Sequence, residues 1–288
     1  MTTKSLLQLA LLDVAMMDRR VVYEFQEGLL PGMLRNRYKR FLATVEFEDG
    51  MKTVHCPNTG SMIGIVKYRD NRDGIEYDEN KECLCSCSND DKRKYSHTLE
   101  YVRDDFNILV GIYSSRANTY VRNALELGLI DEIKGFDSLQ QEKNMFDSKI
   151  DFVAVWSKGQ KEPITMLIEV KSVTLAVKNG SQTVAVWPDC VSERGQRHIK
   201  LLTSYNNNEN QKSAIIFVIQ RNDEPECFSA STLDRDYLQL LSQAYNQNVL
   251  VLPYLFHYNT NESNIKLTRR VPFVDAYSSG GKRSKYFK

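Results

Sequence analysis

The chain has 288 residues, of which 42% are hydrophobic and 26% charged, values ordinary for a soluble protein and sufficient for two modest domains. Its apolar runs are shorter than a bilayer-spanning helix needs, so we expect no membrane partner. The net charge of +1 provides no general attraction for a polyanion, and any nucleic-acid surface must therefore be a local patch.

Residues 1–20 precede the first strand-like segment. Gln8 and Asp13 interrupt their leucine-rich run and no small-residue cleavage site follows, a pattern that favours an N-terminal extension over a signal peptide. From residue 21 to 66, short strand-like segments alternate with turn signals, and Asp49-Gly50 is typical of a hairpin. Several short strands without an amphipathic helix predict a small OB-like β-barrel over residues 21–105, an architecture often used for nucleic acid.

Basic residues form local clusters despite the balanced charge. One interpretation is phosphate contact, with Tyr38 and Phe41 interleaved for stacking on bases, and the alternative is solvated surface charge. The candidate nucleic-acid-binding residues are Arg37, Lys39, Arg40, Lys92, Arg93, Lys94, Arg194, Arg197 and His198.

Residues 68–88 are polar and predict an exposed loop or insertion. The stretch ends with Cys83, Cys85 and Cys87, whose spacing is too tight for the usual zinc knuckle, so we expect a structural or incidental role for them. The six cysteines follow no pairing pattern, which fits a reducing compartment and a cytoplasmic location, associated with the nucleoid if the protein is bacterial.

The second half of the chain alternates strand and helix patterns. We expect Asn118 to cap a helix that runs to about Leu127, and further helices at residues 193–205 and 233–247. Buried strands are expected between and after these helices, which predicts an α/β (α+β) mixed sheet flanked by helices over residues 106–276. Residues 277–288 have the composition of a flexible basic tail.

Two neighbouring strand-like runs carry acidic residues. Asp151 lies near the start of the run at residues 150–156, and Glu169 and Lys171 lie near the end of the run at residues 164–173. Residues two apart on a strand share a face, so Glu169 and Lys171 should lie side by side. An Asp followed by Glu-x-Lys on the next strand is the signature of the PD-(D/E)XK nuclease fold, in which two carboxylates hold a divalent cation. The alternative is a salt-bridged strand end.

The helix expected at residues 193–205 has a polar face that can be turned toward these acidic strands. Glu193, Gln196, Arg197 and Lys200 follow one another along it at helical spacing. His55 precedes a Pro-Asn-Thr-Gly turn, and we expect it to hold this turn or an interdomain contact through hydrogen bonds rather than to act as a catalytic residue or ligand. The backbone N–H groups of that turn are an alternative phosphate site.

Several blocks together resemble the sugar fermentation stimulation protein A (SfsA) family. They are RYKRFLA (37–43), HCPNTGSM (55–62), DKRKYSHTLE (91–100), SKIDF (148–152), IEVKSVTL (168–175) and PDCVSERGQRH (188–198). The blocks occur in family order over most of the chain. The resemblance implies an N-terminal OB-like domain, a C-terminal PD-(D/E)XK nuclease-like domain, DNA binding and a role in regulating genes of sugar utilisation.

The same resemblance carries functional positions onto this chain. Asp151, Glu169 and Lys171 match the acid–acid–lysine core, Gln196 is a supporting polar residue, and Glu142 matches a family acid. The chain departs from the family in three places. Asn123 stands where relatives often carry Glu, residues 68–88 are longer than usual, and both ends are additions.

The chemistry expected of this core is metal-dependent phosphodiester hydrolysis. Asp151 and Glu169 supply carboxylates to Mg²⁺ or Mn²⁺, and the backbone carbonyl of Val170 is a further candidate ligand. Lys171 would orient the attacking water or stabilise the pentavalent phosphorus, and Gln196 or Arg197 would contact the scissile phosphate.

Two hypotheses about function follow, and both have DNA as the partner. The first is a DNA-binding protein of the SfsA type with a divalent-metal-dependent nuclease site. The second is a non-catalytic DNA-binding regulator of sugar-metabolism genes that uses the nuclease fold as a scaffold. The intact acidic core favours the first hypothesis, and Asn123 favours the second. The sequence leaves open whether the protein forms a homodimer.

Overall fold

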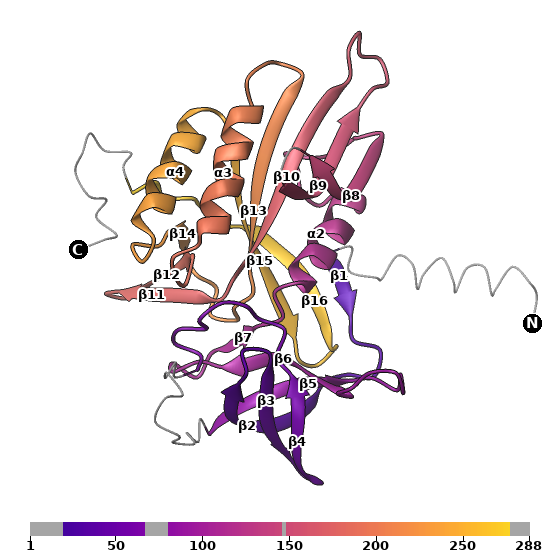
Figure 1. Cartoon of the computed structure of the whole chain (residues 1–288), viewed down its shortest axis with the longest axis vertical. Coiled ribbons are helices and arrows are strands. Elements are labelled where there is room, and N and C mark those ends of the chain that lie inside the picture. The colour runs from indigo at the N-terminus through magenta and orange to yellow at the C-terminus, as the bar shows by residue number, and fades with distance from the viewer. Residues whose placement is uncertain (1–19, 67–79, 146–147, 277–288) are drawn as a thin grey trace, which may run out of the picture.

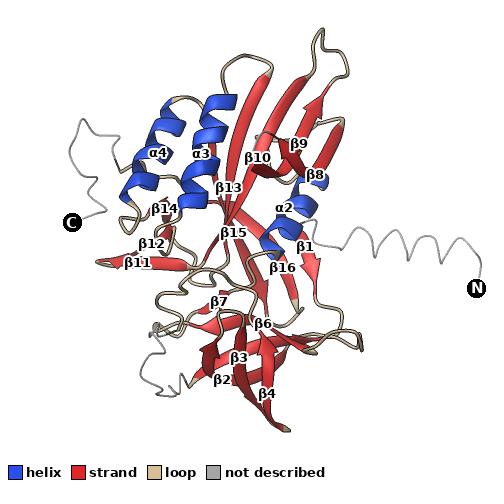
Figure 2. Cartoon of the chain, in the orientation of Figure 1, coloured by secondary structure: helices blue, strands red, loops and turns tan. Residues whose placement is uncertain are grey.

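The computed structural model describes residues 20–66, 80–145 and 148–276, which form three β-sheets and the helices packed on them. The predicted fold class, an OB-like barrel followed by a mixed sheet flanked by helices, is confirmed (Figures 1 and 2). The extension expected at residues 1–20, apart from Arg20, and the tail at 277–288 lie outside the described residues. None of the described helices is long and apolar enough to cross a bilayer.

The N-terminal sheet has the strand order β4-β3-β2-β5-β6-β7, and a further pairing of β4 with β6 closes it into a barrel. Its strands are β2 (Leu30–Tyr38), β3 (Leu42–Phe47), β4 (Gly50–His55), β5 (Lys81–Cys87), β6 (His97–Arg103) and β7 (Leu109–Gly111). The predicted hairpin is present, because β3 and β4 pair with Phe47 opposite Gly50. Alternate apolar side chains of these strands, such as Val45 and Val54, fill the barrel.

The prediction of an exposed loop or insertion at residues 68–88 falls partly on residues 68–79, which lie outside the described residues, and it is wrong for residues 81–87. Residues Lys81–Cys87 form β5, which pairs with both β2 and β6. Cys83 and Cys85 are buried in the barrel core, where they pack as small apolar side chains. The charged residues around them hid the period-2 alternation that makes this segment a strand.

The C-terminal sheet has the order β1-β16-β15-β13-β10-β9-β8. Its strands are β1 (Val21–Glu24), β8 (Ser138–Met145), β9 (Ser148–Trp156), β10 (Ile164–Val173), β13 (Gln211–Ile219), β15 (Leu250–Asn259) and β16 (Asn264–Arg270). The central strands β10, β13 and β15 are parallel, and the flanking pairs are antiparallel. Strand β13 is apolar along most of its length because the sheet is covered on both faces.

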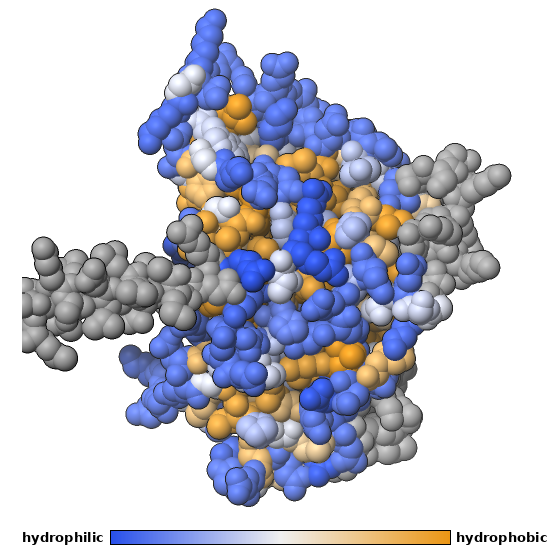
Figure 3. All heavy atoms as spheres, turned by 180° about the vertical axis from the view of Figure 1, so that it is seen from behind, coloured by the Kyte–Doolittle hydropathy of each residue, from blue (hydrophilic) through white to orange (hydrophobic). Residues whose placement is uncertain are grey.

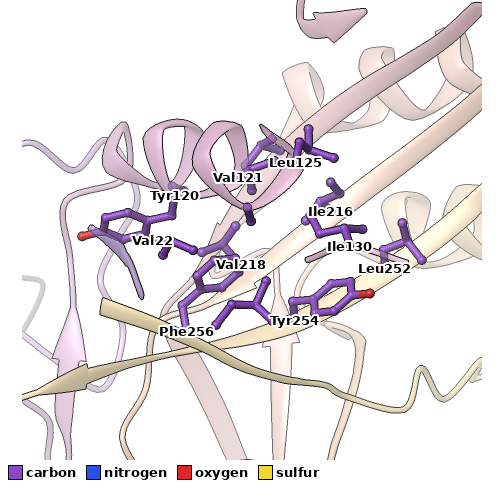
Figure 4. Close-up of a cluster of buried hydrophobic side chains, with 14 of the residues drawn as sticks. Val22, Tyr120, Val121, Leu125, Ile130, Ile216, Val218, Leu252, Tyr254 and Phe256 are labelled. Atoms are coloured by element: carbon purple, nitrogen blue, oxygen red, sulfur yellow. The ribbon is translucent and has the colours of Figure 1, made fainter. Parts of the chain in front are cut away.

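Helices cover the two faces of this sheet differently. Helix α2 (Arg116–Glu126) packs on one face, where its residues Tyr120 and Val121 belong to one buried cluster with Ile216 and Val218 of β13 (Figure 4). Helices α3 (Glu193–Tyr205) and α4 (Arg235–Asn246) pack side by side on the other face. A small sheet of β11 (Leu175–Asn179), β12 (Gln182–Trp187) and β14 (Cys227–Ala230) lies between α4 and the barrel.

Three assignments differ from the sequence-based expectation. Strand β1 pairs with β16 of the C-terminal sheet, although we expected residues from 21 onward to belong to the barrel. Strand β7 pairs with β6 of the barrel sheet, although we expected residues from 106 onward to belong to the second domain. Helix α2 begins after Ser115, so Asn118 is not its cap. By contrast, helix α3 starts as predicted, because the Ser192 hydroxyl accepts a hydrogen bond from the backbone N–H of Gly195 at 3.1 Å.

Buried polar contacts join the barrel to the C-terminal sheet. On α2, Arg116 binds the carboxylate of Glu100, a barrel residue that is 1% exposed, with 2.6 Å between Nε and Oε2. The buried guanidinium of Arg221 binds Asp104 at the edge of the barrel, with 2.8 Å between Nη2 and Oδ2. Because these charges are partnered across the interface, they hold the two halves in a defined orientation.

Exposed large apolar side chains are scattered over the described surface. They include Phe41 and Met51 on the barrel and Leu127, Val191 and Tyr245 on the C-terminal half. Seen from behind, the apolar areas are interrupted by hydrophilic side chains (Figure 3). Scattered apolar residues of this kind are normal and do not by themselves mark a docking surface.

Candidate metal and nucleic-acid site

Asp151 and Glu169 lie where two neighbouring strands stop pairing. Strands β9 and β10 pair from Ile164 opposite Trp156 to Ile168 opposite Phe152, and the two acids are the next residues along. Beyond that point, the Asp151 side chain takes the place of a backbone acceptor for Val170. Its Oδ2 accepts a hydrogen bond from the Val170 N–H at 2.8 Å. The sheet therefore opens locally and places a carboxylate in the opening.

Helix α2 fixes the second oxygen of Asp151. The side-chain Nδ2 of Asn118 donates a hydrogen bond to Asp151 Oδ1 at 2.8 Å. Asn123, five residues further along the helix, instead donates to the backbone oxygen of Val22 at 2.7 Å and ties α2 to β1. The helix residue that touches the acidic core is therefore Asn118, which we expected from the sequence to be a helix cap and not a residue of this site.

Glu169 is 2% exposed and carries the most unusual oxygen of the site. Its Oε1 is bound by the ammonium of Lys171 and by Nδ1 of His198. Its Oε2 is buried and has no hydrogen-bond partner among the described residues. Buried carboxylate oxygens without a partner are rare, because they lose their hydration without compensation. This oxygen is therefore free to serve as a ligand.

The surroundings move the pKa values of the two acids in opposite directions. Burial, and then the negative charge of Glu169, raise the pKa of Asp151 to about 6. Burial alone would also raise the pKa of Glu169. The positive charge of Lys171 and the hydrogen bond from His198 outweigh burial and hold that pKa below its ordinary value. Glu169 is thus the firmly ionised member of the pair.

Lys171 shares a face with Glu169, as the i, i+2 spacing predicts. Its ammonium lies 5.6 Å from the centre of the Trp187 ring, at the end of β12. The lysine side chain is only 12% exposed. Its position is therefore set by the glutamate on one side and by an aromatic ring on the other.

Helix α3 presents a different residue to the site than the one we expected. Gln196 points to α4, where its Nε2 donates to Asp234 Oδ1 at 2.9 Å. His198, which we assigned to the DNA-binding patch, is 5% exposed and bonded to Glu169. The available signal was its place beside Ile199 and four residues before Leu202, on the buried face of the helix.

The candidate metal ligands can be tested against this geometry. In a strand, the N–H and C=O of one residue point to the same side, so the carbonyl of Val170 faces Asp151 as its N–H does. Two carboxylates, one with a free buried oxygen, and a carbonyl are the hard oxygen ligands that Mg²⁺ and Mn²⁺ prefer. These residues fit a divalent cation whose coordination is completed by water. Within the described residues, no group of three His, Cys, Asp or Glu forms a complete protein-only site.

The basic residues fall into three places. Arg37 is half-buried and donates to the backbone oxygens of Asn58 at 2.7 Å and Gly60 at 3.1 Å. Lys39 and Arg40 lie on the exposed turn between β2 and β3. The residues on exposed surfaces elsewhere are Lys92, Arg93 and Lys94 on the β5–β6 loop and Arg194 and Arg197 on α3.

The turn at residues 57–62 contacts the C-terminal half. The Asp189 carboxylate accepts hydrogen bonds from the Met62 N–H at 2.8 Å and from the Ser61 hydroxyl at 3.0 Å. A Cβ on Gly60 would lie 2.7 Å from the same carboxylate, which explains the glycine there. Two donors of the turn therefore bind a protein carboxylate, as expected for an interdomain contact. Glu142 lies on the exposed strand β8 and pairs with Lys149 at 2.6 Å.

Comparison with known proteins supports the two-part organisation. Residues 36–112 match the family described as SfsA N-terminal OB domain, and residues 115–262 match the sugar fermentation stimulation protein RE domain. A sugar fermentation stimulation protein homolog of Saccharophagus degradans is 37% identical over 232 residues, 80% of this chain and 92% of that protein. A homolog from Shewanella sp. strain MR-4 is 36% identical, over 84% of this chain and 96% of that protein.

A solved structure has the same fold. The structure of Pyrococcus furiosus SfsA in complex with Ca²⁺ matches with a TM-score of 0.70 and 21% identity, over 88% of this chain and 99% of that chain. An OB barrel joined to a mixed sheet that is flanked by helices and carries an Asp and Glu-x-Lys core defines a two-part α/β protein with an N-terminal OB barrel. The chain belongs to the sugar fermentation stimulation protein (SfsA) family. Membership in this family supports DNA binding.

Proposed function

We propose that the protein binds DNA and hydrolyses a phosphodiester bond with the help of a divalent cation held at Asp151 and Glu169. The observation that carries this proposal is the buried Oε2 of Glu169, which has no partner among the described residues and lies in a site with a second carboxylate. A salt-bridged strand end, the alternative explanation of Glu-x-Lys, does not require a second acid close enough to raise its neighbour's pKa.

The residues have distinct roles in this proposal. Asp151, Glu169 and the carbonyl of Val170 would hold Mg²⁺ or Mn²⁺. When bound, the cation would neutralise charge on the phosphate and lower the pKa of an attacking water. Asn118 and the Val170 N–H keep Asp151 in place, each through a 2.8 Å hydrogen bond. A residue held by two bonds from different elements needs little rearrangement when the substrate arrives.

Lys171 is the candidate electrostatic partner of the phosphate. Its ammonium already lies beside Glu169, so it can turn from the carboxylate to a phosphate oxygen without leaving the site. The Trp187 ring keeps the lysine stem in this region. Gln196, bonded to Asp234, supports the junction of α3 with α4 in the structure, and Arg197 is an exposed cation of α3 available to DNA.

The Ca²⁺ complex of the Pyrococcus furiosus relative supports a divalent cation. Ca²⁺, Mg²⁺ and Mn²⁺ all prefer oxygen ligands, and they differ mainly in size and in the geometry they demand. We propose that the cation site of this chain lies at the acidic core described above. The fold likeness identifies no ligand residue.

A second candidate function is DNA binding without cleavage, in a regulator of sugar-metabolism genes. The observation that favours it is that Lys171 and His198 already bind Glu169, so part of the site's negative charge is compensated without a cation. Asn123 contributes nothing to the acidic core, since it bonds to Val22. In this case the nuclease fold would serve only to position the barrel and α3 on DNA.

One experiment separates the two candidates. The protein is incubated with duplex, single-stranded and branched DNA in Mg²⁺, in Mn²⁺ and in EDTA, next to the variant Asp151→Asn. The matched control is Asp131→Asn, which changes an exposed acid paired with Lys134 on the same domain. We expect cleavage in Mn²⁺ or Mg²⁺, none in EDTA, and a loss of at least about a hundredfold in Asp151→Asn only. Cleavage that survives EDTA and Asp151→Asn refutes the nuclease site, and binding without cleavage selects the regulator.

A further inference from the structure

A small hollow on the barrel is lined entirely by residues suited to nucleic acid. His55, Arg93, Lys94 and Tyr95 line an open depression of about 180 Å³ between the end of β4 and the loop that joins β5 to β6. Two of these side chains carry a positive charge and two carry a flat ring. The combination of cations with aromatic rings is typical of surfaces that bind unpaired nucleotides.

The loop that forms one wall is held in shape by its own hydrogen bonds. The Ser88 N–H donates to the Ser96 backbone oxygen at 2.9 Å, and the Lys92 N–H donates to the Asp90 carboxylate at 3.0 Å. The Arg93 guanidinium donates to the Thr98 hydroxyl at 3.2 Å. Thr98 in turn pairs with His55 across the closure of the barrel. The hollow is therefore part of the folded barrel and does not depend on a loose loop.

Among the described residues, the cations of the hollow have no acidic partner. Neither Arg93 nor Lys94 forms an ion pair with a described carboxylate, and the Lys94 ammonium lies 5.5 Å from the centre of the Tyr95 ring. The buried acid nearby, Glu100, is already engaged by Arg116 and by Ser86. Unneutralised cations around a concave surface attract an anion of matching size.

A second loop brings another aromatic ring to the same end of the barrel. The turn at residues 39–41 joins β2 to β3 and ends in Phe41, whose ring is 43% exposed. Leu42 pairs with His55, and the Cys56 N–H donates to the Phe41 backbone oxygen at 2.8 Å. Phe41 and Tyr95 therefore lie on loops that both adjoin His55, with Lys39 and Arg40 on the first of them.

We infer that this hollow binds one unpaired nucleotide of a DNA strand. Arg93 and Lys94 contact its phosphate, its base stacks on Tyr95, and Phe41 receives a neighbouring base. A base inside a duplex is stacked on both sides and paired, so it cannot enter a hollow of this size. The barrel consequently prefers single-stranded or locally unpaired DNA to intact duplex. The inference rests on the proposed DNA binding and is independent of cleavage.

The test measures binding in EDTA, so that cleavage does not interfere. A labelled oligothymidine of about 12 nucleotides, within the site size of an OB barrel, is compared by fluorescence anisotropy with a duplex of equal length. We expect Tyr95→Ala to weaken binding of the single strand by about fivefold or more, to leave duplex affinity within about twofold, and Tyr95→Phe to restore it. The matched control is Tyr245→Ala, which removes a half-exposed ring on α4.

The charged wall is tested with salt. The double variant Arg93→Ala/Lys94→Ala should lower the slope of log affinity against log salt for the single strand by about 1.4, that is about 0.7 for each lost phosphate contact. Equal loss of single-strand and duplex binding in Tyr95→Ala, or an unchanged salt slope, overturns the hollow as a nucleotide site but leaves DNA binding intact. Failure of the wild-type protein to bind either DNA overturns the proposed function itself.

Discussion

The barrel and the C-terminal sheet use charge in opposite ways. In the sheet, Glu169 is buried and bonded to Lys171 and His198. In the barrel, Arg93 and Lys94 are exposed and have no described carboxylate partner. Buried and partnered charges have fixed positions and suit chemistry, whereas exposed cations suit attraction of a phosphate backbone over a range of geometries.

The difference has an experimental consequence. At ordinary ionic strength, salt largely screens the interaction between exposed charges that are more than about 10 Å apart. It acts much less on buried charges. DNA affinity should therefore fall steeply with salt, while the affinity of the acidic core for a divalent cation should change little. The contacts between the two halves decide whether the two kinds of site act on one DNA molecule.

The largest expected effect concerns these contacts. Arg116→Ala leaves the Glu100 carboxylate, which is 1% exposed, without its cation, and should lower the free energy of unfolding by about 3–5 kcal/mol. Urea denaturation followed by circular dichroism measures it. The matched control is Arg122→Ala on the same helix, whose exposed i, i+4 pair with Glu126 should cost less than about 0.5 kcal/mol. Equal losses in the two variants would mean that the interface charge has no special role.

The next effect is a pH dependence of the metal-free protein. The pKa of Asp151 is raised from 3.8 to about 6 in the folded state. The stability that this protonated carboxyl contributes is complete below pH 3.8 and is lost as the pH rises through about 6. In EDTA, the unfolding free energy of the wild type should therefore fall by about 2–3 kcal/mol relative to Asp151→Asn between pH 4 and pH 7.

Thermal or urea unfolding at several pH values measures this difference. If the unfolding free energies of the wild type and of Asp151→Asn changed with pH in parallel, folding would not raise the pKa of the Asp151 carboxyl. Addition of Mn²⁺ at pH 7 should recover the lost stability in the wild type only, since a ligand that binds the folded state stabilises it. The sheet site would then resemble many functional sites, where like charges are held together at a cost in stability.

The acidic core could be predicted from the sequence because strand geometry is strictly periodic. Two residues on one strand with i, i+2 spacing must share a face, which placed Lys171 beside Glu169. Asp151 could be placed beside them from the preceding strand, since strands this close in sequence commonly pair. Nothing in that reasoning required knowledge of the helices.

The helix contributions could not be predicted in the same way. Which face of α2 meets Asp151 depends on how the helix crosses the sheet, and this decides between Asn118 and Asn123. For α3, charged residues drew attention to the exposed face, while His198 was on the buried face. Strand β5 was missed because Cys83 and Cys85 serve as core residues within a charged stretch.

The smallest of these predicted effects tests His198 as the residue that positions Glu169. The histidine uses Nδ1, which is three bonds from Cα, and the amide nitrogen of Asn is also three bonds away, whereas that of Gln is four. His198→Asn should therefore keep the affinity for Mn²⁺ within about threefold of the wild type. His198→Gln and His198→Ala should lower it about tenfold or more, as for other residues that orient a metal ligand. Calorimetric titration with Mn²⁺ measures the affinities.

The ranking of the variants separates positioning from packing. If His198 only filled space in the core, Asn would be a poorer replacement than Gln because its side chain is smaller. The affinity for Mn²⁺ would then follow thermal stability across the three variants. A donor at the Nδ1 position instead predicts that Asn preserves Mn²⁺ affinity even where it lowers the melting temperature. His257→Asn, a change at a histidine of β15 outside the acidic core, should leave Mn²⁺ binding unchanged. Affinity that tracks side-chain volume would remove His198 from the site and leave Asp151 and Glu169 to be oriented by the strands alone.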